Sequence, residues 1–214
     1  KHGKHVYCEK PLTHTIFEAR TVSQTAAATK KATQMGTQIH ATDNYRRVVE
    51  LIQAGAIGAV KEAHVWVGRA WGRQSAEDAK KFGDIVHIEE RPAEAQPVPG
   101  GLNWDLWLGP SPAHPWNPAY FEGSSGMNCL SWNMYWDFGS GQVGDMGSHT
   151  MDLAWNAIDA GLPTSAEGKG DPFNPEVTPV KLETHFEVPA NDWRRALRVA
   201  WYQGGAMPET PANF

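Results

Sequence analysis

The fold is decided by the stretch Gly139-Ser140-Gly141-Gln142-Val143-Gly144-Asp145-Met146-Gly147-Ser148-His149-Thr150-Met151-Asp152. Its first glycines indicate a loop, because glycine reaches backbone angles that are closed to other residues. From about Gly144 the pattern predicts a helix with one apolar side, which ends at Gly161-Leu162-Pro163. On that helix Asp145, His149 and Asp152 share one face, because their spacing is i, i+4 and i+7. A carboxylate and an imidazole at the mouth of a flexible loop are the groups that proton transfer needs.

Three other interpretations of this stretch were weighed against proton transfer. His149 could be only the hydrogen-bonding partner of a neighbouring acid. A metal site would need more than Asp145, His149 and Asp152, and no second His or Cys supports one, so no metal is expected. The letters Gly139-x-Gly141-x-x-Gly144 match the dinucleotide-binding fingerprint. That match is rejected, because the aromatic and polar segment 132–138 before it is not a β-strand.

The composition narrows the class of protein. The 214 residues are enough for one large domain or two small ones, and 41% hydrophobic with 20% charged residues is typical of a globular protein. The net charge of −5 argues against nucleic acid or an anionic membrane as a partner. No apolar run is long enough to span a membrane. Cys8 and Cys129 are too few for a disulfide framework, and no signal peptide is visible, so a cytoplasmic protein is expected.

The N-terminal part follows a strand–helix–strand pattern. A short β-rich segment at 5–8 predicts the first strand. Thr15 and Glu18 form a capping box, from which a helix is predicted to run to about Met35. A second strand is predicted at 37–40. This spacing is typical of a βαβ unit with a parallel strand pair.

In the rest of the chain, predicted helices and strands alternate less regularly. A helix is predicted at 45–54 and a strand at 60–68, whereas prolines interrupt the segment from 69 to 137 except for a short helical turn at 103–108. A loop of that length is usually functional or disordered, and its Trp, Tyr and Phe content argues against disorder. Clean alternation predicts strands at 180–188 and 196–202. Consecutive strands without helices between them indicate an antiparallel sheet.

Three sequence blocks occur in a characteristic order. They are Gly3-Lys4-His5-Val6-Tyr7-Cys8-Glu9-Lys10-Pro11-Leu12, then Asn44-Tyr45-Arg46-Arg47 with the segment 51–58, and then the segment 144–152. The first resembles the Glu-Lys-Pro signature, the second the entry into the sheet domain, and the third the Asp-x-x-x-His helix of one family. This is the glucose–fructose oxidoreductase / inositol dehydrogenase (Gfo/Idh/MocA) family, and the resemblance covers nearly the whole chain.

The resemblance implies a fold class of α/β plus α+β. Residues 1–42 would be the remnant of a Rossmann domain that binds NAD or NADP. Residues 43–214 would form an open, mainly antiparallel sheet domain with helices on one face, which binds substrate and dimerises. Family members begin with a Gly-rich phosphate loop that does not occur here. The chain is therefore expected to be a fragment, cut at both ends and inactive in isolation.

The resemblance also implies roles for particular residues. Lys10 would touch the nicotinamide ribose and the substrate, and Asp145 would position the substrate. His149 would take the hydroxyl proton as hydride leaves the same carbon. The expected cofactor-binding residues are Glu9, Lys10, Pro11 and Trp71, and the expected substrate-binding residues are Asn44, Tyr45, Arg46, Trp132 and Trp136. The large aromatic side chains would cover a sugar ring, with burial in the core as the alternative for each.

The predicted function is an NAD(P)-dependent oxidoreductase that transfers hydride between a nicotinamide cofactor and a sugar, inositol or related polyol. Two alternatives stand beside it. One is a glycoside hydrolase that uses bound NAD in a redox-assisted mechanism, as one branch of the family does. The other is a non-catalytic piece that dimerises. The expected partners are a small carbohydrate or polyol and a second copy of the chain through the sheet face, with neither nucleic acid nor membrane.

Overall fold

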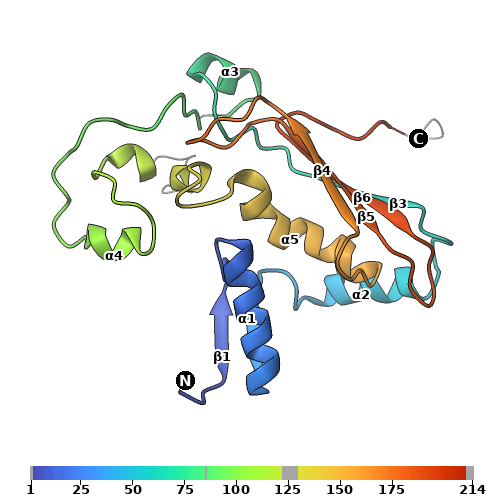
Figure 1. Ribbon diagram of the computed structural model, residues 1–214. Coiled ribbons are helices and arrows are strands. Elements are labelled where there is room, and N and C mark those ends of the chain that lie inside the picture. Colours follow the sequence, from blue (N-terminus) through green and yellow to red (C-terminus); the bar gives the residue numbers. More distant parts are fainter. Residues whose placement is uncertain (1, 85, 122–129, 211–214) are drawn as a thin grey trace.

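The computed structural model describes residues 2–84, 86–121 and 130–210 (Figure 1). In this part the strands form a two-stranded sheet near the N-terminus and a larger four-stranded sheet. A long central helix, α5 (Gly141–Ala157), lies between the two sheets. This arrangement of strands and helices confirms the predicted α/β plus α+β class.

The N-terminal unit consists of β1 (Val6–Glu9), α1 (Ile16–Thr29) and β2 (Thr33–Gly36). The two strands pair in parallel, from Val6 opposite Thr33 to Glu9 opposite Gly36. The predicted βαβ unit is therefore confirmed. The predicted positions of the helix end and of the second strand were wrong, because β2 lies inside the segment that was assigned to the helix.

Local chemistry explains where α1 ends. Lys30 adopts a left-handed backbone with φ of 50° and donates its N–H to the carbonyl of Ala26, which closes the last turn. None of the α1 residues is buried, so tertiary packing does not extend the helix beyond this point. The β-branched Thr33 then favours the strand that follows.

The four-stranded sheet is built from β3 (Glu62–Trp66), β4 (Ser165–Gly170), β5 (Leu182–Val188) and β6 (Leu197–Gln203). Its order is β3-β6-β5-β4. The β4–β5 and β5–β6 pairs are antiparallel, which confirms a mainly antiparallel sheet. The β3–β6 pair is parallel, and this pairing of two strands far apart in the sequence was not predicted. Strand β4 was not predicted, because its Ser-Ala-Glu-Gly-Lys-Gly sequence is polar and exposed throughout.

One face of this sheet is covered by α5. Val199 and Trp201 of β6 are completely buried on that side. Trp201 packs against Met146 and Ala154 of α5, and Val199 lies in the cluster that contains Ile158 just after the helix. Helix α2 (Asp43–Gln53), which is capped by the Thr42 side chain, packs against α5 rather than against the strands. The helices thus lie on one side of the sheet, as expected (Figure 1).

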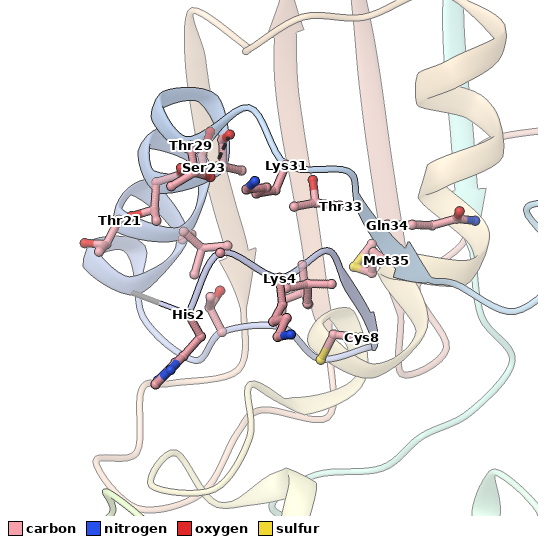
Figure 2. A pocket seen from close by; sticks show the side chains of 18 residues that line it. His2, Lys4, Cys8, Thr21, Ser23, Thr29, Lys31, Thr33, Gln34 and Met35 are labelled. Carbon is pink, nitrogen blue, oxygen red and sulfur yellow. Dashed lines mark hydrogen bonds between the residues drawn. The ribbon is translucent and has the colours of Figure 1, made fainter.

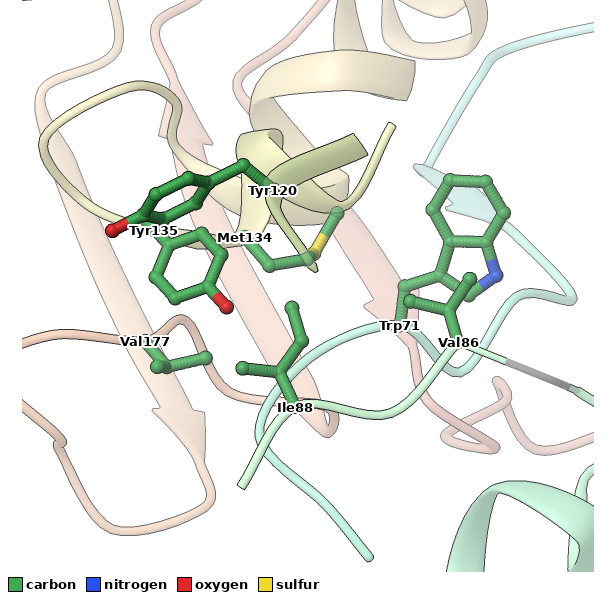
Figure 3. Close-up of a cluster of buried hydrophobic side chains, with 7 residues drawn as sticks. All are labelled: Trp71, Val86, Ile88, Tyr120, Met134, Tyr135 and Val177. Atoms are coloured by element: carbon green, nitrogen blue, oxygen red, sulfur yellow. The ribbon is translucent and has the colours of Figure 1, made fainter. Parts of the chain in front are cut away.

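The segment between β3 and α5 contains more structure than the prolines indicate. The helical turn predicted at 103–108 is confirmed as α4 (Trp104–Leu108), whereas α3 (Ala76–Lys81) was not predicted. Two short 3-10 helices follow at Pro118–Phe121 and Ser131–Met134. Side chains from this segment and from Val177 form a second core, shown in Figure 3. Its buried members are Trp71, Val86, Ile88, Tyr120, Met134, Tyr135 and Val177.

Helix α5 begins three residues earlier than predicted, at Gly141. The start is fixed by Asn133, whose side-chain amide donates to the carbonyl of Gly141 at 3.1 Å. The approach is tight, because a Cβ on Gly139 would lie 2.3 Å from the Asn133 side-chain oxygen. Gly141 itself has φ of 68°, which a residue with a side chain rarely adopts. Tertiary contacts therefore override the low helix propensity of this glycine-rich sequence.

Candidate functional site

The site is organised around an ion pair between two distant parts of the chain. Lys10 follows directly after β1, and its Nζ donates to Oδ1 of Asp145 at 2.6 Å and to the Asp145 carbonyl at 3.1 Å. The two residues are 135 positions apart in the sequence. Their side chains are 23% and 16% exposed, so the pair is largely removed from water without being sealed from it. The structure thus brings together two of the three predicted catalytic residues.

A second cation lies on the other side of the same carboxylate. Arg69, just beyond the end of β3, has Nη1 3.8 Å from Oδ2 of Asp145. Its guanidinium lies over the ring of Trp71, 4.7 Å from the centroid. The sequence analysis did not select Arg69. The available signal was a basic residue placed where an alternating strand ends, at the same edge as other site residues.

His149 lies one helical turn beyond Asp145 on α5, as its i+4 spacing predicts. Its Nδ1 is buried, and it has no hydrogen-bonding partner among the described residues. Most buried polar atoms in folded proteins have a partner. Within the described part of the chain, no acid is hydrogen-bonded to this atom, and the role of His149 stays a prediction.

One further turn along α5, Asp152 is held by one residue from the turn before α2 and by one from α2 itself. Its Oδ2 is 2.6 Å from His40 Nδ1 and accepts a hydrogen bond from the Tyr45 hydroxyl at 2.8 Å. The Tyr45 hydroxyl is also 3.0 Å from the Asp152 carbonyl. Burial, followed by this hydrogen bond to Asp152, raises the pKa of Tyr45 to about 12. Tyr45 therefore stays protonated and keeps donating to Asp152 throughout the neutral range.

The other predicted substrate-binding residues of α2 face elsewhere. Arg46 is exposed and pairs with Asp43 on the same helix. Asn44 is also exposed, near the start of the helix. Tyr45 is buried, and its hydroxyl is already engaged by Asp152. The structure therefore does not bring Asn44 and Arg46 to the Lys10–Asp145 pair, and substrate contact by these residues stays a prediction.

A pocket of about 550 Å³ opens beside the Lys10–Asp145 pair. Pro11 lies on one side of it, and Trp132, Phe138 and Ser140 line the wall that precedes α5. The pocket lies at the carboxyl end of β1, the end at which open parallel sheets bind ligands. Of the predicted substrate-binding residues, Trp132 is the one that lines this pocket.

The aromatic side of the pocket is backed by a polar network. Arg91 pairs with Asp137 at 2.7 Å and with Glu176, and His114 Nε2 lies 2.7 Å from the same Asp137 carboxylate. Burial alone would lower the pKa of Arg91, but hydrogen bonds to Tyr120 and Glu176 outweigh it and raise the pKa. The arginine therefore remains charged and fixes Asp137, the residue next to Phe138 in the pocket wall.

Two predicted ligand-binding tryptophans lie elsewhere. Trp71 is 2% exposed, belongs to the second core, and donates from Nε1 to Asp84 at 2.9 Å (Figure 3). Trp136 donates to the carbonyl of Asn174 and lies against Phe173, away from the pocket lining. Most of the tryptophan-rich segment packs against itself, for example through the stacked rings of Trp104 and Trp107. Burial is the role that these contacts support for most of the aromatic residues.

The N-terminal unit carries a second, larger cavity of about 1140 Å³ between α1 and the two strands (Figure 2). Its walls include Val6, Val22 and Met35, which are all exposed apolar residues. Cys8 lies in the same cavity as a free thiol, and Cys129 falls outside the described residues. Parallel sheets are normally covered on both faces, so this cavity marks an apolar surface that the described residues leave open.

The fit of a nicotinamide cofactor to these residues is partial. A dinucleotide usually places its pyrophosphate on a helix N-terminus. At the N-terminus of α1 the backbone N–H groups of His14 and Thr15 already donate to Glu18, at 2.7 and 3.0 Å. These hydrogen bonds, with that from His14 as the largest cause, lower the pKa of Glu18. These two N–H groups are therefore not free for a pyrophosphate, and contact of a nicotinamide with Glu9, Lys10 and Pro11 stays a prediction.

The described residues contain neither a metal-binding cluster nor a membrane-spanning helix. No group of three or more His, Cys, Asp or Glu side chains in this part of the chain is arranged to hold a metal ion. Within 2–84, 86–121 and 130–210, none of the helices combines the length and the apolar character needed to cross a membrane.

Comparison with family models gives a match to part of the chain. The family model described as the C-terminal alpha/beta domain of the oxidoreductase family Gfo/Idh/MocA matches residues 80–163. No curated protein matches the sequence. The match confirms the resemblance that the sequence blocks predict.

Solved structures share the fold at low sequence identity. An inositol dehydrogenase homolog from Azotobacter vinelandii, complexed with NAD+, has a TM-score of 0.50 and 16% identity over 96% of this chain and 41% of that chain. An NAD binding oxidoreductase from Klebsiella pneumoniae has a TM-score of 0.50 and 18% identity over 95% and 43%. A super-repressor mutant of Gal80p from Saccharomyces cerevisiae has a TM-score of 0.51 and 13% identity over 95% and 43%. The chain thus spans less than half the length of each.

Proposed function

We propose that this chain, which carries the C-terminal domain of the Gfo/Idh/MocA oxidoreductase family, is part of an enzyme that uses NAD or NADP to oxidise or reduce a sugar, inositol or related polyol. The observation that carries the proposal is the contact of 2.6 Å between Lys10 Nζ and Asp145 Oδ1. It places a cation that follows a parallel strand beside the helix that bears His149. The family match and the NAD-complexed neighbour support the same chemistry.

Each residue has a distinct part in the proposed reaction. When bound, the nicotinamide accepts or supplies the hydride. His149 takes the proton of the substrate hydroxyl as hydride leaves the carbon, and returns it in the reverse direction. Lys10 donates a hydrogen bond to the same oxygen as negative charge develops on it. Asp145 holds the Lys10 ammonium in place from the opposite side. Trp132 in the pocket wall offers an apolar ring face to the carbohydrate.

The proposed organisation of the whole protein follows the same family. Residues 1–42 would complete a nucleotide-binding domain together with other parts of the protein, with Glu9, Lys10 and Pro11 at the nicotinamide end. Residues 43–214 would bind substrate. The sheet face opposite α5 would pair with a second copy, and Trp66, which is 49% exposed at the β3 edge of that face, would enter the interface.

The test uses the full-length protein with NAD or NADP and a panel of sugars and polyols, and follows reduction of the nicotinamide. His149→Ala is expected to lower kcat about 10²–10⁴-fold with little change in KM, the range for a lost general base. Met151→Leu is the matched control, because it conserves volume on the same helix and costs under about 1.5 kcal/mol of stability. If His149 were only structural, His149→Ala would lower the melting temperature and leave turnover per folded molecule unchanged.

A parallel assay with aryl glycosides separates the polyol oxidoreductase from the redox-assisted glycoside hydrolase. Release of the aryl group that requires NAD, without net reduction of the cofactor, would favour the hydrolase. Light scattering of the wild-type protein and of a Trp66→Lys variant tests the proposed dimer face independently of either activity.

A further inference from the structure

The carboxylate of Asp145 is shared by two cations, which leaves this group of side chains with an excess of positive charge. Lys10 Nζ lies 2.6 Å from Oδ1, and Arg69 Nη1 lies 3.8 Å from Oδ2. Among the described residues, neither cation has another carboxylate at ion-pairing distance. Lys10, Asp145 and Arg69 are 23%, 16% and 34% exposed, so water screens the excess charge only in part. Charges that are removed from water are normally paired, and this group is short of one anion.

The guanidinium of Arg69 is held in place by contacts that use few of its hydrogen-bond donors. It lies over the ring of Trp71, 4.7 Å from the centroid, and Trp71 is itself fixed by donation from Nε1 to Asp84 at 2.9 Å. The 3.8 Å contact with Asp145 is too long for a hydrogen bond. A second contact of 3.8 Å joins Nη1 to Met146 Sδ, which is a weak acceptor. In the part of the chain that the structure describes, the other N–H groups of Arg69 have no acceptor.

The position of Arg69 is tied to the candidate site through Asp145. Lys10 and Asp145 both line the pocket of about 550 Å³, and Arg69 approaches the other oxygen of the same carboxylate. Because both cations contact one carboxyl group, a single small ligand can reach both. The two cations differ in what they bind best. An ammonium acts as a point charge, whereas the planar guanidinium donates two parallel hydrogen bonds to a carboxylate or a phosphate.

We propose that Arg69 is a specificity-determining residue that binds an anionic group of the substrate. The substrate class is then a sugar or polyol that carries a carboxylate or a phosphate, with its reacting hydroxyl at Lys10 and its anionic group at Arg69. The negative charge of such a ligand supplies the anion that Lys10, Asp145 and Arg69 lack. The inference rests on the proposed function for the polyol part of the substrate, and it deepens that function by naming the charged group.

The first test measures binding to the full-length protein by calorimetry, with NAD or NADP present. The ligands are matched pairs that differ in one charged group: glucuronate and glucose, galacturonate and galactose, and gluconate and glucitol. A phosphate ester of glucose distinguishes a phosphate from a carboxylate. At least one anionic ligand should bind about 10–100-fold more tightly than its neutral counterpart, the range for a hydrogen bond to a charged group. If none binds more tightly than its neutral counterpart, the proposal is overturned.

The second test assigns the preference to Arg69. Arg69→Gln removes the charge and should abolish the preference for the anionic ligand, with the affinity for the neutral ligand unchanged. Arg69→Lys keeps a charge beside Asp145 but loses the planar fork, and should retain only part of the preference. Arg198→Gln is the matched control, because it removes an arginine paired with Glu187 on the sheet face opposite α5 and should leave the preference unchanged.

Thermal melts of the same preparations show which variants are folded. A full preference in folded Arg69→Gln would overturn the proposal, because the anion would then be bound elsewhere. If Arg69→Gln does not fold, Arg69→Lys decides: a reduced preference supports the proposal, and an unchanged one overturns it.

Turnover with the same ligands separates this proposal from the proposed function. If a neutral polyol reduces the cofactor and no anionic ligand binds more tightly, the proposed function stands and the role of Arg69 is refuted. If an anionic ligand binds through Arg69 but no ligand exchanges hydride with the cofactor, the proposed function fails and Arg69 remains an anion-binding residue. Reduction of the cofactor by an anionic ligand, with KM raised in Arg69→Gln and kcat changed less, would support both.

Discussion

Asp145→Asn is expected to destabilise the protein more than Lys10→Met. The reason is the asymmetry of the pair: Asp145 faces two cations, whereas Lys10 faces one carboxylate. Lys10 Nζ lies 2.6 Å from Oδ1, and Arg69 Nη1 lies 3.8 Å from Oδ2. Lys10→Met leaves the carboxylate with Arg69 as a partner. Asp145→Asn leaves the positive charges of Lys10 and Arg69 near each other, without the carboxylate that lies between them and offsets their repulsion.

The magnitudes follow from these distances. With an effective dielectric constant of about 20, the attraction is roughly 6 kcal/mol for Lys10 and roughly 4 kcal/mol for Arg69, before desolvation is subtracted. Arg69 is about a third exposed, so solvent screens its share further. Desolvation cancels most of both attractions. We therefore expect a loss of about 1–2 kcal/mol for Lys10→Met and about 2–4 kcal/mol for Asp145→Asn.

Urea unfolding of the two single variants and the double variant gives these losses and the coupling energy of the pair. The double variant should lose less than the sum of the two single losses. The control is Asp43→Asn, which removes an exposed i,i+3 partner of Arg46 and should cost under about 1 kcal/mol. Equal losses, or a greater loss for Lys10→Met, would refute the view that Asp145 is the shared anion of two cations.

Three further predictions concern stability. The pKa of Tyr45 is raised from 10.0 to about 12. The stability that the protonated Tyr45 side chain contributes is therefore fully present below pH 10 and is lost between pH 10 and about 12. Thermal melts should show that Tyr45→Phe removes part of this alkaline loss. Arg91→Met leaves Asp137 and Glu176 without their cation and should cost about 2–4 kcal/mol in urea unfolding, whereas Arg198→Met, which breaks an exposed pair with Glu187, should cost much less. Gly204→Ala places a Cβ 2.2 Å from the Val180 carbonyl at φ of 64° and should lower the melting temperature more than Gly55→Ala, which has φ of 79° but open space around it.

The parts of the fold that the sequence predicted are those set by local chemistry. Thr15 and Glu18 do form the capping box of α1, because the side chain of each residue accepts a hydrogen bond from the backbone N–H of the other. The strands β5 and β6 were found because apolar and polar residues alternate in their sequences, although in the structure β5 is mostly half-buried and β6 is buried at nearly every residue. The end of α1 was missed because it depends on the left-handed backbone conformation of Lys30, which no pattern in the sequence predicts. The parallel pairing of β3 with β6 was missed because register between distant strands is a tertiary property.

As with the fold, the sequence predicted only part of the candidate site. The contact between Lys10 and Asp145 came from the family resemblance, since nothing in composition or spacing relates residues so far apart. Trp71 was placed at the cofactor, but its indole donates to Asp84 inside the core. The sequence could not separate these outcomes, because a large aromatic residue serves equally in a pocket wall and in a core. The contacts of Arg69 and His40 were missed because each residue has its partner on α5, remote in the chain.

The polar face of α5 shows why His149 stands apart from its neighbours. Asp145 is neutralised by Lys10 and Arg69, and Asp152 is held by His40 and Tyr45. His149 lies between these two carboxylates, and its buried Nδ1 has no partner in the described part of the chain. A buried polar atom without a hydrogen bond costs stability. Apolar residues would avoid that cost at this position. The same helix also leaves the side-chain nitrogen and oxygen of Gln142 without a described partner, so the unpaired imidazole does not by itself mark a catalytic residue. What sets His149 apart is its place between two paired carboxylates, and under the proposed function it is this imidazole that exchanges a proton with the substrate.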